Sequence, residues 1–334
     1  MTRYIIIGAG AVGASLAAQF ESAGIAYALV GRGAQIRHIR EHGLTYQRPT
    51  GTQQIRLNAF DTADPPELKA DDVLVLAVKA QDVEDATAFW ARRPVADKLE
   101  TAGFALPLVT LQNGLAAEAV ASRRFARVYG ASILTPARFT EVGTVVAGGS
   151  PQVGVVTLGI YPSGLDDLGR AIAGDLVKAN YLAEARSDIT RWKAAKLVYN
   201  VKNALEVFEG SAEDVASIGE TLSQEATRVL SAAGYEIAQP SERQVSVAGW
   251  GAAPDSGIKS GQQSTWQSFA RGVPNEIDYL NGEIVQLGRI HGIETPWNQA
   301  VQEAAARLVL TGGQPGSISL AEVRTIVRES PLAA

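Results

Sequence analysis

Short apolar runs alternate with longer amphipathic stretches through the first half of the chain. An apolar run bounded by turn-forming residues is typical of a strand that is buried on both faces. Helical periods between such runs predict a doubly wound parallel sheet, and an apolar hairpin at residues 144–159 is expected to extend it. The four clearest runs lie at residues 4–7, 25–32, 72–80 and 106–114.

Near residue 188 the pattern changes to helical periods with few strand signals. We therefore predict two domains, an α/β domain over residues 1–187 and an all-α domain over residues 188–334. Residues 248–264 are rich in glycine and serine and predict a long loop, which in a compact domain is often functional. Helices are expected at residues 189–208, 213–233, 274–291, 296–310 and 320–329.

Three glycines, Gly8, Gly10 and Gly13, separate the first predicted strand from an alanine-rich helix. In this context the spacing is typical of a dinucleotide-binding turn. The first glycine permits a tight turn, the second lets the backbone approach a pyrophosphate, and the third allows close helix–strand packing. Ala11 and Val12 begin the helix, whose free N–H groups suit phosphates. This interpretation makes the first domain Rossmann-like; a purely structural strand–helix joint is the alternative.

Arg32 stands at the end of the second predicted strand, where NAD-dependent members of this fold carry an acidic residue. A guanidinium matches the 2′-phosphate of NADP in charge and geometry, so we expect NADPH as the cofactor. A surface arginine is the alternative. Lys79 follows the third strand at the carboxyl edge of the sheet, where it is either a second phosphate ligand or an ordinary solvated lysine.

Composition argues against several classes of protein, including nucleic-acid-binding, disulfide-bonded and membrane-spanning proteins. The formal net charge is −5, from 30 basic and 35 acidic residues, which argues against nucleic acid as a partner. The chain has no cysteine, which excludes disulfides and thiolate sites and fits a reducing, cytoplasmic location. The first twenty residues lack the features of a signal peptide, and no apolar run is long enough to cross a membrane.

Residues 191–208 predict a helix that is apolar over much of its circumference and is therefore enclosed. Lys196, Asn200 and Asn203 lie on one polar stripe of this helix, at i, i+4 and i+7. A polar stripe on an enclosed helix faces a cavity, water or polar partners. A snorkelling lysine with two satisfied asparagines is the alternative. Lys193 lies one turn earlier, and we expect it to matter much less than Lys196.

Two other polar positions have plain structural interpretations when taken alone. Asn113 follows the fourth predicted strand, where an amide could hold a substrate or a nicotinamide, but Asn-Gly is also a common turn. Glu276 is expected in the first turn of a helix that begins at Pro274, where a carboxylate complements the helix dipole.

Taken together and in order, these segments resemble the ketopantoate reductase (2-dehydropantoate 2-reductase) family over nearly the whole length of the chain. The specific part is the K-x-x-x-N pattern followed by EIDYLNG in an all-helical second domain. The matching segments are GAGAVG at residues 8–13, Arg32, VKA at 78–80, QNG at 112–114, K-x-x-x-N at 196–200 and EIDYLNG at 276–282.

The resemblance implies roles for individual residues. Lys196 would donate a proton to the ketone oxygen, and Glu276 would contact the substrate hydroxyl and the lysine. Asn113 would lie beside the nicotinamide and the substrate, with Ser264 on the substrate carboxylate. Asn200 matches the first asparagine of the family's helix.

Three segments depart from the family pattern near the expected substrate position. The family's second helix asparagine is Ala204 here, and Asn203 stands one place early; we keep Asn203 as a candidate substrate-binding residue. An aspartate of the family is Ser268, and residues 135–139, TPARF, replace a segment that contains Thr and His.

We therefore expect an NADPH-dependent oxidoreductase that reduces a small 2-oxo acid, with 2-dehydropantoate the leading substrate and pantothenate biosynthesis the implied pathway. A paralogous reductase of another keto or imino compound is the alternative that the departures favour. An NADP-binding regulatory protein without turnover is a third, although a pure binder needs none of Lys196, Asn200 and Glu276. No metal is expected, since His38 and His42 lack the HExxH pattern. A homodimer is compatible with the sequence.

Overall fold

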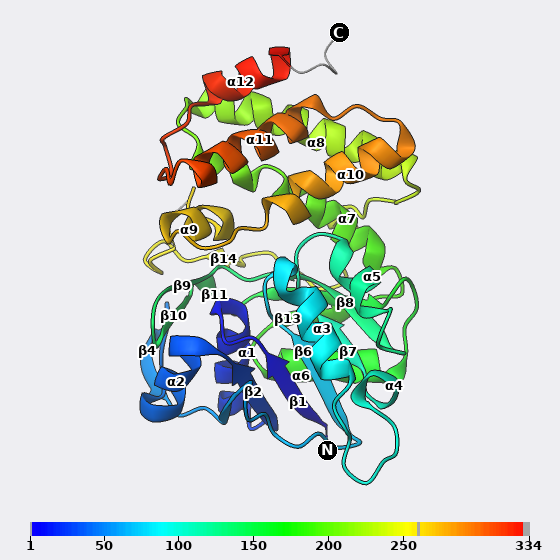
Figure 1. Ribbon diagram of the computed structural model, residues 1–334. Coiled ribbons are helices and arrows are strands. Elements are labelled where there is room, and N and C mark those ends of the chain that lie inside the picture. The colour runs from blue at the N-terminus through cyan, green and yellow to red at the C-terminus, as the bar shows by residue number, and fades with distance from the viewer. Residues whose placement is uncertain (1, 259–260, 330–334) are drawn as a thin grey trace. The chain divides into compact units, whose positions relative to one another are not determined.

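The computed structural model describes residues 2–258 and 261–329, and its element labels are those of Figure 1. The main sheet of the described chain has eight strands in the order β13-β12-β8-β7-β6-β1-β2-β5. Neighbouring strands are parallel except for β8 and β12, which are antiparallel. The strands are β1 (Arg3–Ile7), β2 (Tyr27–Gly31), β5 (Ala59–Asp61), β6 (Asp72–Leu76), β7 (Leu108–Thr110), β8 (Val128–Leu134), β12 (Val155–Ile160) and β13 (Leu182–Ala185).

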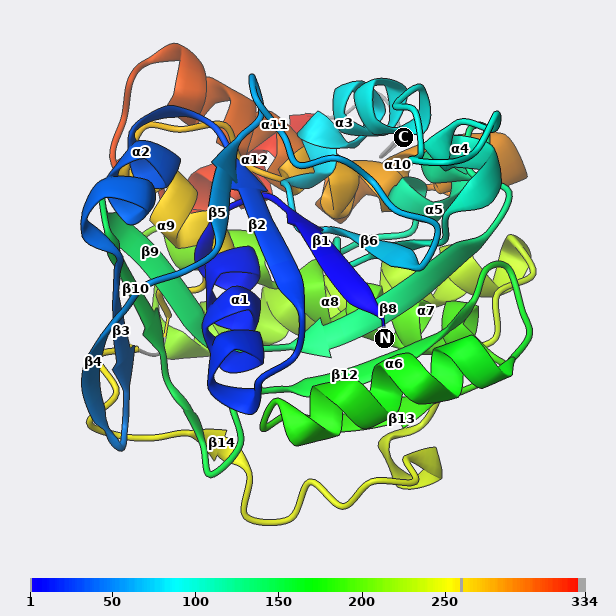
Figure 2. The same cartoon turned by 90° about the horizontal axis from the view of Figure 1, so that it is seen from below.

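Alternate side chains of β1 enter two different hydrophobic clusters. Tyr4 and Ile6 join the cluster that contains residues of helices α1 (Ala11–Ala23) and α6 (Asp167–Lys178). Ile5 and Ile7 join the cluster of α3 (Val83–Ala91) and α5 (Ala116–Ala121) on the other face (Figure 2). The sheet is therefore buried on both faces, which explains why its strands are continuously apolar.

The strand order places a reversal at β1, which lies between β2 and β6. Ligands of doubly wound sheets bind where the strand order reverses, beyond the carboxyl ends of the strands. Helix α2 (Gly33–His42) follows β2, and the 3₁₀ helix η1 (Ala80–Asp82) follows β6. A further short helix, α4 (Ala102–Ala105), precedes β7.

A smaller, four-stranded sheet packs against α1. The predicted hairpin at residues 144–159 is wrong, because its two halves belong to different sheets. The first half pairs within the small sheet, whereas β12 pairs with β8 and β13 in the main sheet. An apolar run does not encode its partner, so the pattern could not separate these outcomes. The small sheet has the order β4 (Gly51–Ile55), β3 (Leu44–Arg48), β10 (Thr144–Ala147) and β9 (Ala137–Glu141).

The second half of the chain is helical, as predicted. One hydrophobic cluster, separate from the clusters of the sheet, holds its helices together. Helices α11 and α12 have the predicted bounds. The helices are α7 (Ile189–Asn200), η2 (Asn203–Val207), α8 (Ala212–Ala232), α9 (Ser264–Ala270), η4 (Ile277–Tyr279), α10 (Asn281–His291), α11 (Pro296–Leu310) and α12 (Leu320–Glu329), with the 3₁₀ turn η3 (Pro240–Glu242) between α8 and α9.

Two helix predictions need correction. The helix predicted at residues 189–208 ends at Asn200, and a 3₁₀ helix follows. Leu205 N donates to the carbonyl of Lys202, while the Val201 carbonyl accepts from the side chain of Asn281 at 2.9 Å. The helix predicted from Pro274 begins only at Asn281, after the short helix η4. Pro274 therefore lies outside any helix.

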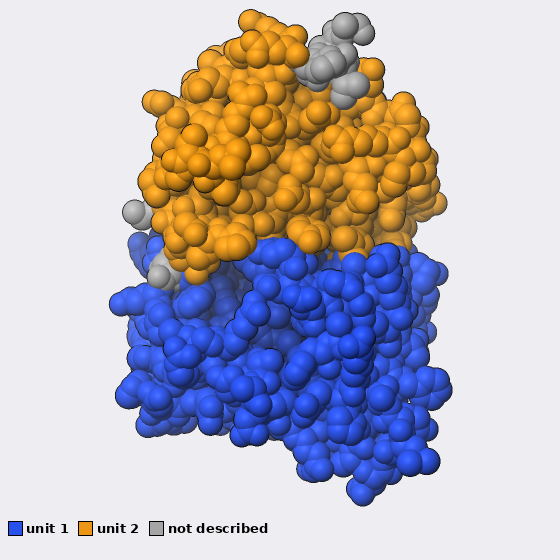
Figure 3. Space-filling model, in the orientation of Figure 1, with its two compact units in different colours: residues 1–112, 117–189, 241–258 blue, residues 113–116, 190–240, 259–334 orange. Residues whose placement is uncertain are grey.

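The chain divides into two compact units (Figure 3). Unit 1 comprises residues 1–112, 117–189 and 241–258, and unit 2 comprises residues 113–116, 190–240 and 259–334. The first of these units therefore includes residues 241–258, a segment that we call the strap and that follows the first helices of unit 2 in sequence. The boundary at residue 187 between two folding domains stays a prediction.

The strap is fastened to the rest of unit 1 by backbone and side-chain hydrogen bonds. Its strand β14 (Gly251–Ala252) pairs with β11 (Gly149–Ser150), and Trp250 Nε1 donates to the Gln152 carbonyl at 3.1 Å. Part of the predicted loop at residues 248–264 is therefore a short strand. Lys259 and Ser260 lie outside the described residues.

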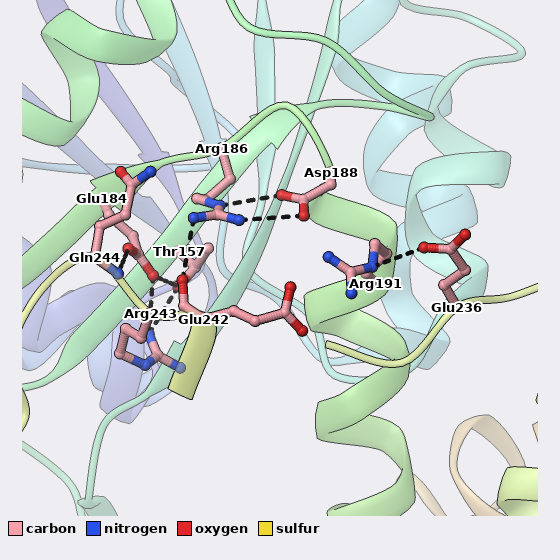
Figure 4. Close-up of polar contacts among 9 residues, drawn as sticks. All are labelled: Thr157, Glu184, Arg186, Asp188, Arg191, Glu236, Glu242, Arg243 and Gln244. Carbon is pink, nitrogen blue, oxygen red and sulfur yellow. Dashed lines mark hydrogen bonds and ion pairs between the residues drawn. The ribbon is translucent and has the colours of Figure 1, made fainter. Parts of the chain in front are cut away.

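A buried carboxylate holds the start of the strap (Figure 4). The side chain of Glu184, on β13, is 3% exposed. It accepts hydrogen bonds from Thr157 Oγ1 at 3.0 Å and from the backbone N–H of Gln244 at 2.7 Å, and it forms an ion pair with Arg243 at 3.4 Å. Arg243 also donates to Thr157 at 2.8 Å. Release of the strap would leave the buried carboxylate of Glu184 without Arg243 and Gln244, and an unpaired buried charge destabilises a protein.

Candidate active site

The turn between β1 and α1 has the geometry of a phosphate cradle. Gly8 has φ +117°, and a Cβ there would lie 2.7 Å from the backbone carbon of Ala77 at the end of β6. A Cβ on Gly13 would overlap the Gly8 carbonyl oxygen, so this glycine allows helix α1 to approach the strand. A Cβ on Gly10 would meet nothing within 4 Å. Packing of the protein therefore does not require a glycine at position 10, and the space beside Gly10 is open.

The N-terminus of α1, at Ala11 and Val12, suits an anion. Its N-cap is Gly10, which provides no side-chain hydrogen bond, and its first turn has no acidic residue. The first N–H groups of a helix and its dipole attract negative charge, and here no carboxylate of that turn competes. The cradle and the helix end together fit the pyrophosphate of a dinucleotide.

Arg32 and Lys79 follow strand ends at the same edge of the sheet, after β2 and β6. Arg32 is the N-cap of α2, its side chain is 78% exposed, and it forms an ion pair with Asp82 at 2.9 Å. An exposed pair of this kind is weak and easily exchanged for a phosphate. Lys79 is partly buried. Arg32 thus lies after the second strand, where the adenosine ribose of a dinucleotide binds in this fold, and Lys79 lies across β1 at the same edge of the sheet.

Gln112, from the QNG segment, has a structural role. Its Nε2 donates to the carbonyls of Leu76 at 2.8 Å and Val78 at 2.9 Å, which ties the end of β7 to the end of β6. The side-chain oxygen of the next residue, Asn113, is buried and has no hydrogen-bond partner in the described part of the chain. Asn113 therefore has a free acceptor.

In unit 2, α7 carries Lys196 and Asn200 one turn apart, as the predicted stripe requires. Asn203 does not continue the stripe, because it belongs to η2. Asn200 is 3% and Asn203 5% exposed, and Lys196 is partly buried. The Nδ2 atom of Asn200 is buried and has no hydrogen-bond partner among residues 2–258 and 261–329. A buried amide in this state is costly unless a ligand completes its hydrogen bonds.

Lys196 is electrostatically perturbed. Burial lowers its pKa to about 7, the charge of Lys193 acts in the same direction, and the carboxylate of Glu276 acts in the opposite direction. Glu276 and Lys193 are both buried, at 7% and 4% exposure. Unit 2 therefore brings together a lysine that titrates near neutral pH and a buried carboxylate, which is typical of a proton-transfer site.

A buried hydrogen-bond chain, which the sequence did not indicate, holds the C-terminal end of α7. Asn281 Nδ2 donates to the Val201 carbonyl at 2.9 Å and to Asn298 Oδ1 at 3.0 Å. Asn298 Nδ2 donates in turn to Glu225 at 2.8 Å. The Glu225 carboxylate also accepts from the N–H groups of Trp297 and Asn298, at the start of α11. The polar chain thus fixes the backbone beside Asn200 through three other helices.

Ser264 is the first residue of α9 and is partly buried. The start of this helix is held by Glu206 of η2, which accepts from the N–H and the Nε2 of Gln263 at 2.7 and 2.9 Å. Burial raises the pKa of Glu206. The element that carries Asn203 therefore also fixes the element that carries Ser264.

Two family models match most of the chain. Residues 4–162 match the family described as ketopantoate reductase PanE/ApbA, and residues 188–308 match the family described as its C-terminal part. The chain belongs to the ketopantoate reductase family. Members of this family are oxidoreductases that use a nicotinamide cofactor.

Relatives named 2-dehydropantoate 2-reductase are similar over most of the chain. The protein of Pyrococcus horikoshii is 26% identical over 302 residues, which cover 88% of this chain and 93% of the relative. The protein of Archaeoglobus fulgidus is 28% identical over 311 residues, which cover 90% and 95%.

Solved structures share the fold. A PanE/ApbA family ketopantoate reductase from Ralstonia eutropha has a TM-score of 0.74 at 22% identity, and the match covers 93% of this chain and 99% of that one. A D-mandelate dehydrogenase, solved with NADH and anilino(oxo)acetate, has a TM-score of 0.73 at 19% identity, with 98% and 99% covered.

The departures from the ketopantoate reductase pattern have structural explanations. Ala204 is 1% exposed and belongs to the hydrophobic cluster of unit 2. Ser268 is fully buried, and its hydroxyl donates to the Ser264 carbonyl at 3.0 Å within α9. In the segment TPARF, Ala137 and Arg138 pair with β10. The side chains of Ala204 and Ser268 therefore pack or bond locally, as does the backbone of Ala137 and Arg138.

Two further findings concern the described residues alone. Within 2–258 and 261–329, no helix combines the length and the apolar character needed to cross a membrane. In the same ranges, no group of three or more His, Cys, Asp or Glu residues could hold a metal ion.

Proposed function

We propose that this chain reduces the ketone of 2-dehydropantoate to the alcohol of pantoate with NADPH, a step of pantothenate biosynthesis. The observation that carries the proposal is the set Lys196, Glu276 and Asn200 of unit 2. It combines a lysine with a pKa of about 7, a buried carboxylate that acts on it, and a buried amide with a free donor. A buried amide donor with no partner among the described residues costs stability, whereas a reductase can use such a donor, a lysine of this pKa and a carboxylate on its substrate.

Lys196 acts as the general acid. Negative charge develops on the ketone oxygen during reduction, and a preorganised ammonium stabilises this charge before it gives up its proton. Glu276 favours the charged form of Lys196 and so keeps the donor protonated. Asn200, Asn203 and Ser264 supply amide and hydroxyl groups for the substrate carboxylate and hydroxyl, with Asn113 as an acceptor on the same unit.

Unit 1 supplies the residues for the cofactor. NADPH, when bound, provides the hydride that adds to the carbonyl carbon. Gly8, Gly10 and Gly13, with the N–H groups of Ala11 and Val12, hold the pyrophosphate, and Arg32 with Lys79 binds the 2′-phosphate. Asp82 forms an exposed ion pair with the Arg32 guanidinium, and a 2′-phosphate would compete with it for the same group.

One observation favours a second candidate, an NADPH-dependent reductase of another keto or imino compound. Ala204 and Ser268, where the family pattern has polar residues, make no side-chain contact that a substrate could use, because one is in the apolar core and the other bonds within its helix. A keto or imino compound with fewer polar groups than 2-dehydropantoate would fit such a loss of polar groups.

The experiment is a steady-state assay of NADPH oxidation with a panel of 2-oxo acids, simple ketones and imines, run on the parent protein and on Lys196→Ala. We expect reduction of 2-dehydropantoate or a close branched 2-oxo acid. General acids typically accelerate a reaction by about 10²–10⁴-fold, so kcat of the variant should be lower than that of the parent by a factor in this range. NADPH binding, followed by fluorescence, should stay unchanged.

Lys202→Ala is the matched control, because Lys202 lies in the same segment but its ammonium stacks over the Tyr199 ring at 5.7 Å. It should keep full activity. Turnover of only ketones or imines would favour the second candidate, and full activity of Lys196→Ala would refute the assigned acid.

A further inference from the structure

Helix α7 carries two lysines one turn apart, one of them buried and the other partly buried. Lys193 is 4% exposed, and Lys196, three residues later, is partly buried. Residues at i and i+3 of a helix are neighbours, about 5–6 Å apart between their Cβ atoms. Lysine is almost never fully buried, and two like charges at this spacing destabilise a helix. From the sequence, Lys193 is expected to matter much less for activity than Lys196. Because Lys193 is buried, however, water screens its charge only weakly from the neighbouring Lys196.

The charges that act on Lys196 come from two elements. Lys193, on α7 itself, disfavours the ammonium form, and Glu276, which directly precedes η4, favours it. Both act across a poorly solvated region, where water screens charges weakly. The acidity of Lys196 is therefore set by a balance of two buried groups of opposite sign, on top of burial.

We propose that Lys193 is a positioning residue of the proton-donating site, whose buried positive charge one helical turn before Lys196 promotes release of the Lys196 proton. An acid works best when its pKa lies near the pH at which the enzyme operates. A lysine with a lowered pKa is a stronger acid, and it therefore donates its proton more readily while negative charge is still developing on the ketone oxygen. The catalytic meaning of this inference rests on the proposed function, but the effect on Lys196 does not.

The direct test is a pH titration of the cofactor-free, full-length protein labelled with ¹³C at the ε carbon of lysine and followed by NMR. The Lys196 resonance is the one that disappears in Lys196→Arg. In the parent protein it should titrate near pH 7, where exposed lysines do not titrate. In Lys193→Met its midpoint should move upward by about one pH unit, because a neighbouring like charge is removed.

Three further variants make the result specific. Lys193→Arg keeps the charge and should leave the midpoint near that of the parent. Lys202→Met removes a lysine of the same segment that is not among the charges acting on Lys196, and it should also leave the midpoint in place. Glu276→Gln should move the midpoint downward. Lys193→Gln replaces Lys193→Met if the latter does not fold, as judged by circular dichroism.

The proposal is overturned if the Lys196 midpoint in Lys193→Met or Lys193→Gln equals that of the parent, or if Lys193→Arg shifts it as much as these variants do. Assay of the same proteins gives the second readout. Reduction needs protonated Lys196, so kcat should fall as pH rises through the midpoint, and in Lys193→Met this fall should occur at higher pH. If the midpoint shifts but Lys196→Ala keeps full activity, the proposed function fails while the inference about Lys193 stands.

Discussion

At the scale of single residues, Arg32, which we propose as a ligand of NADPH, is paired with a carboxylate in this structure. Its guanidinium is 78% exposed and is bonded to Asp82 at 2.9 Å. The position of Arg32 after the second strand could be predicted from the sequence. The partner could not, because Asp82 lies fifty positions away and only the adjacency of β2 and β6 around β1 brings the two together.

We expect Arg32→Ala to weaken NADPH binding at least tenfold and to leave NADH binding almost unchanged. A charge-assisted hydrogen bond to a phosphate contributes about 1.5–3 kcal/mol, and 1.4 kcal/mol corresponds to a factor of ten. Fluorescence titration with both cofactors measures the effect.

Arg37→Ala is the control for this comparison, since Arg37 is an exposed arginine of the same helix, α2. Its loss should change neither affinity by more than a small factor. Equal affinity of the parent protein for NADH and NADPH would show that Arg32 does not select the cofactor.

At the scale of elements, the turn between β1 and α1 contains glycines with two different roles. Gly13 is needed for packing, whereas Gly10 is needed only for the proposed binding of the cofactor. Gly10→Ala should fold normally, because a Cβ there meets nothing within 4 Å and the φ of −77° is accessible to alanine. The added methyl group would occupy the space proposed for the pyrophosphate, so NADPH affinity should fall by about tenfold or more. Thermal unfolding and cofactor titration measure the two effects separately.

Gly13→Ala should show the reverse order of effects. Its Cβ would overlap the Gly8 carbonyl oxygen, so α1 must move and the melting temperature should fall by several degrees, as expected for overpacking that costs about 1–3 kcal/mol. A Gly10→Ala protein with unchanged NADPH affinity would contradict the cradle.

Helix and strand prediction succeeded where the cause is local. Pro296 at the first position of α11 and the apolar period after it define that helix from the sequence alone. The end of α7 has a distant cause, since Asn281, eighty positions along the chain, takes the Val201 carbonyl that a longer helix would use. No periodicity reports such a contact. For the same reason the sequence does not show that Lys193 is buried, because spacing reveals its neighbour but not its burial.

At the scale of the whole molecule, each unit depends on buried charges that join segments far apart in sequence. We expect Glu184→Ala to reduce the free energy of unfolding by about 3 kcal/mol or more, because removing one member of a buried pair leaves Arg243 without this carboxylate. Urea denaturation of the full chain measures the change.

Glu236→Ala is the matched comparison, because Glu236 forms an ion pair with Arg191 at 3.1 Å but is 80% exposed (Figure 4). Exposed pairs contribute about 0–1 kcal/mol, so its loss should be nearly silent. Equal effects of the two substitutions would mean that the strap is not held by Glu184.

The strap also bears on how the gene of this chain can recombine with that of a relative. A single crossover near codon 188 would join the sheet of one parent to the strap of the other, so that Glu184 and Gln152 would meet strap residues with which they had not been selected together. Exchange of cofactor preference between relatives would then require two crossovers, one on each side of the helices between residues 190 and 240, or a parent whose strap carries the same partners for β11 and β13. Inheritance of unit 1 is thus tied to a short stretch of sequence encoded well downstream of most of it.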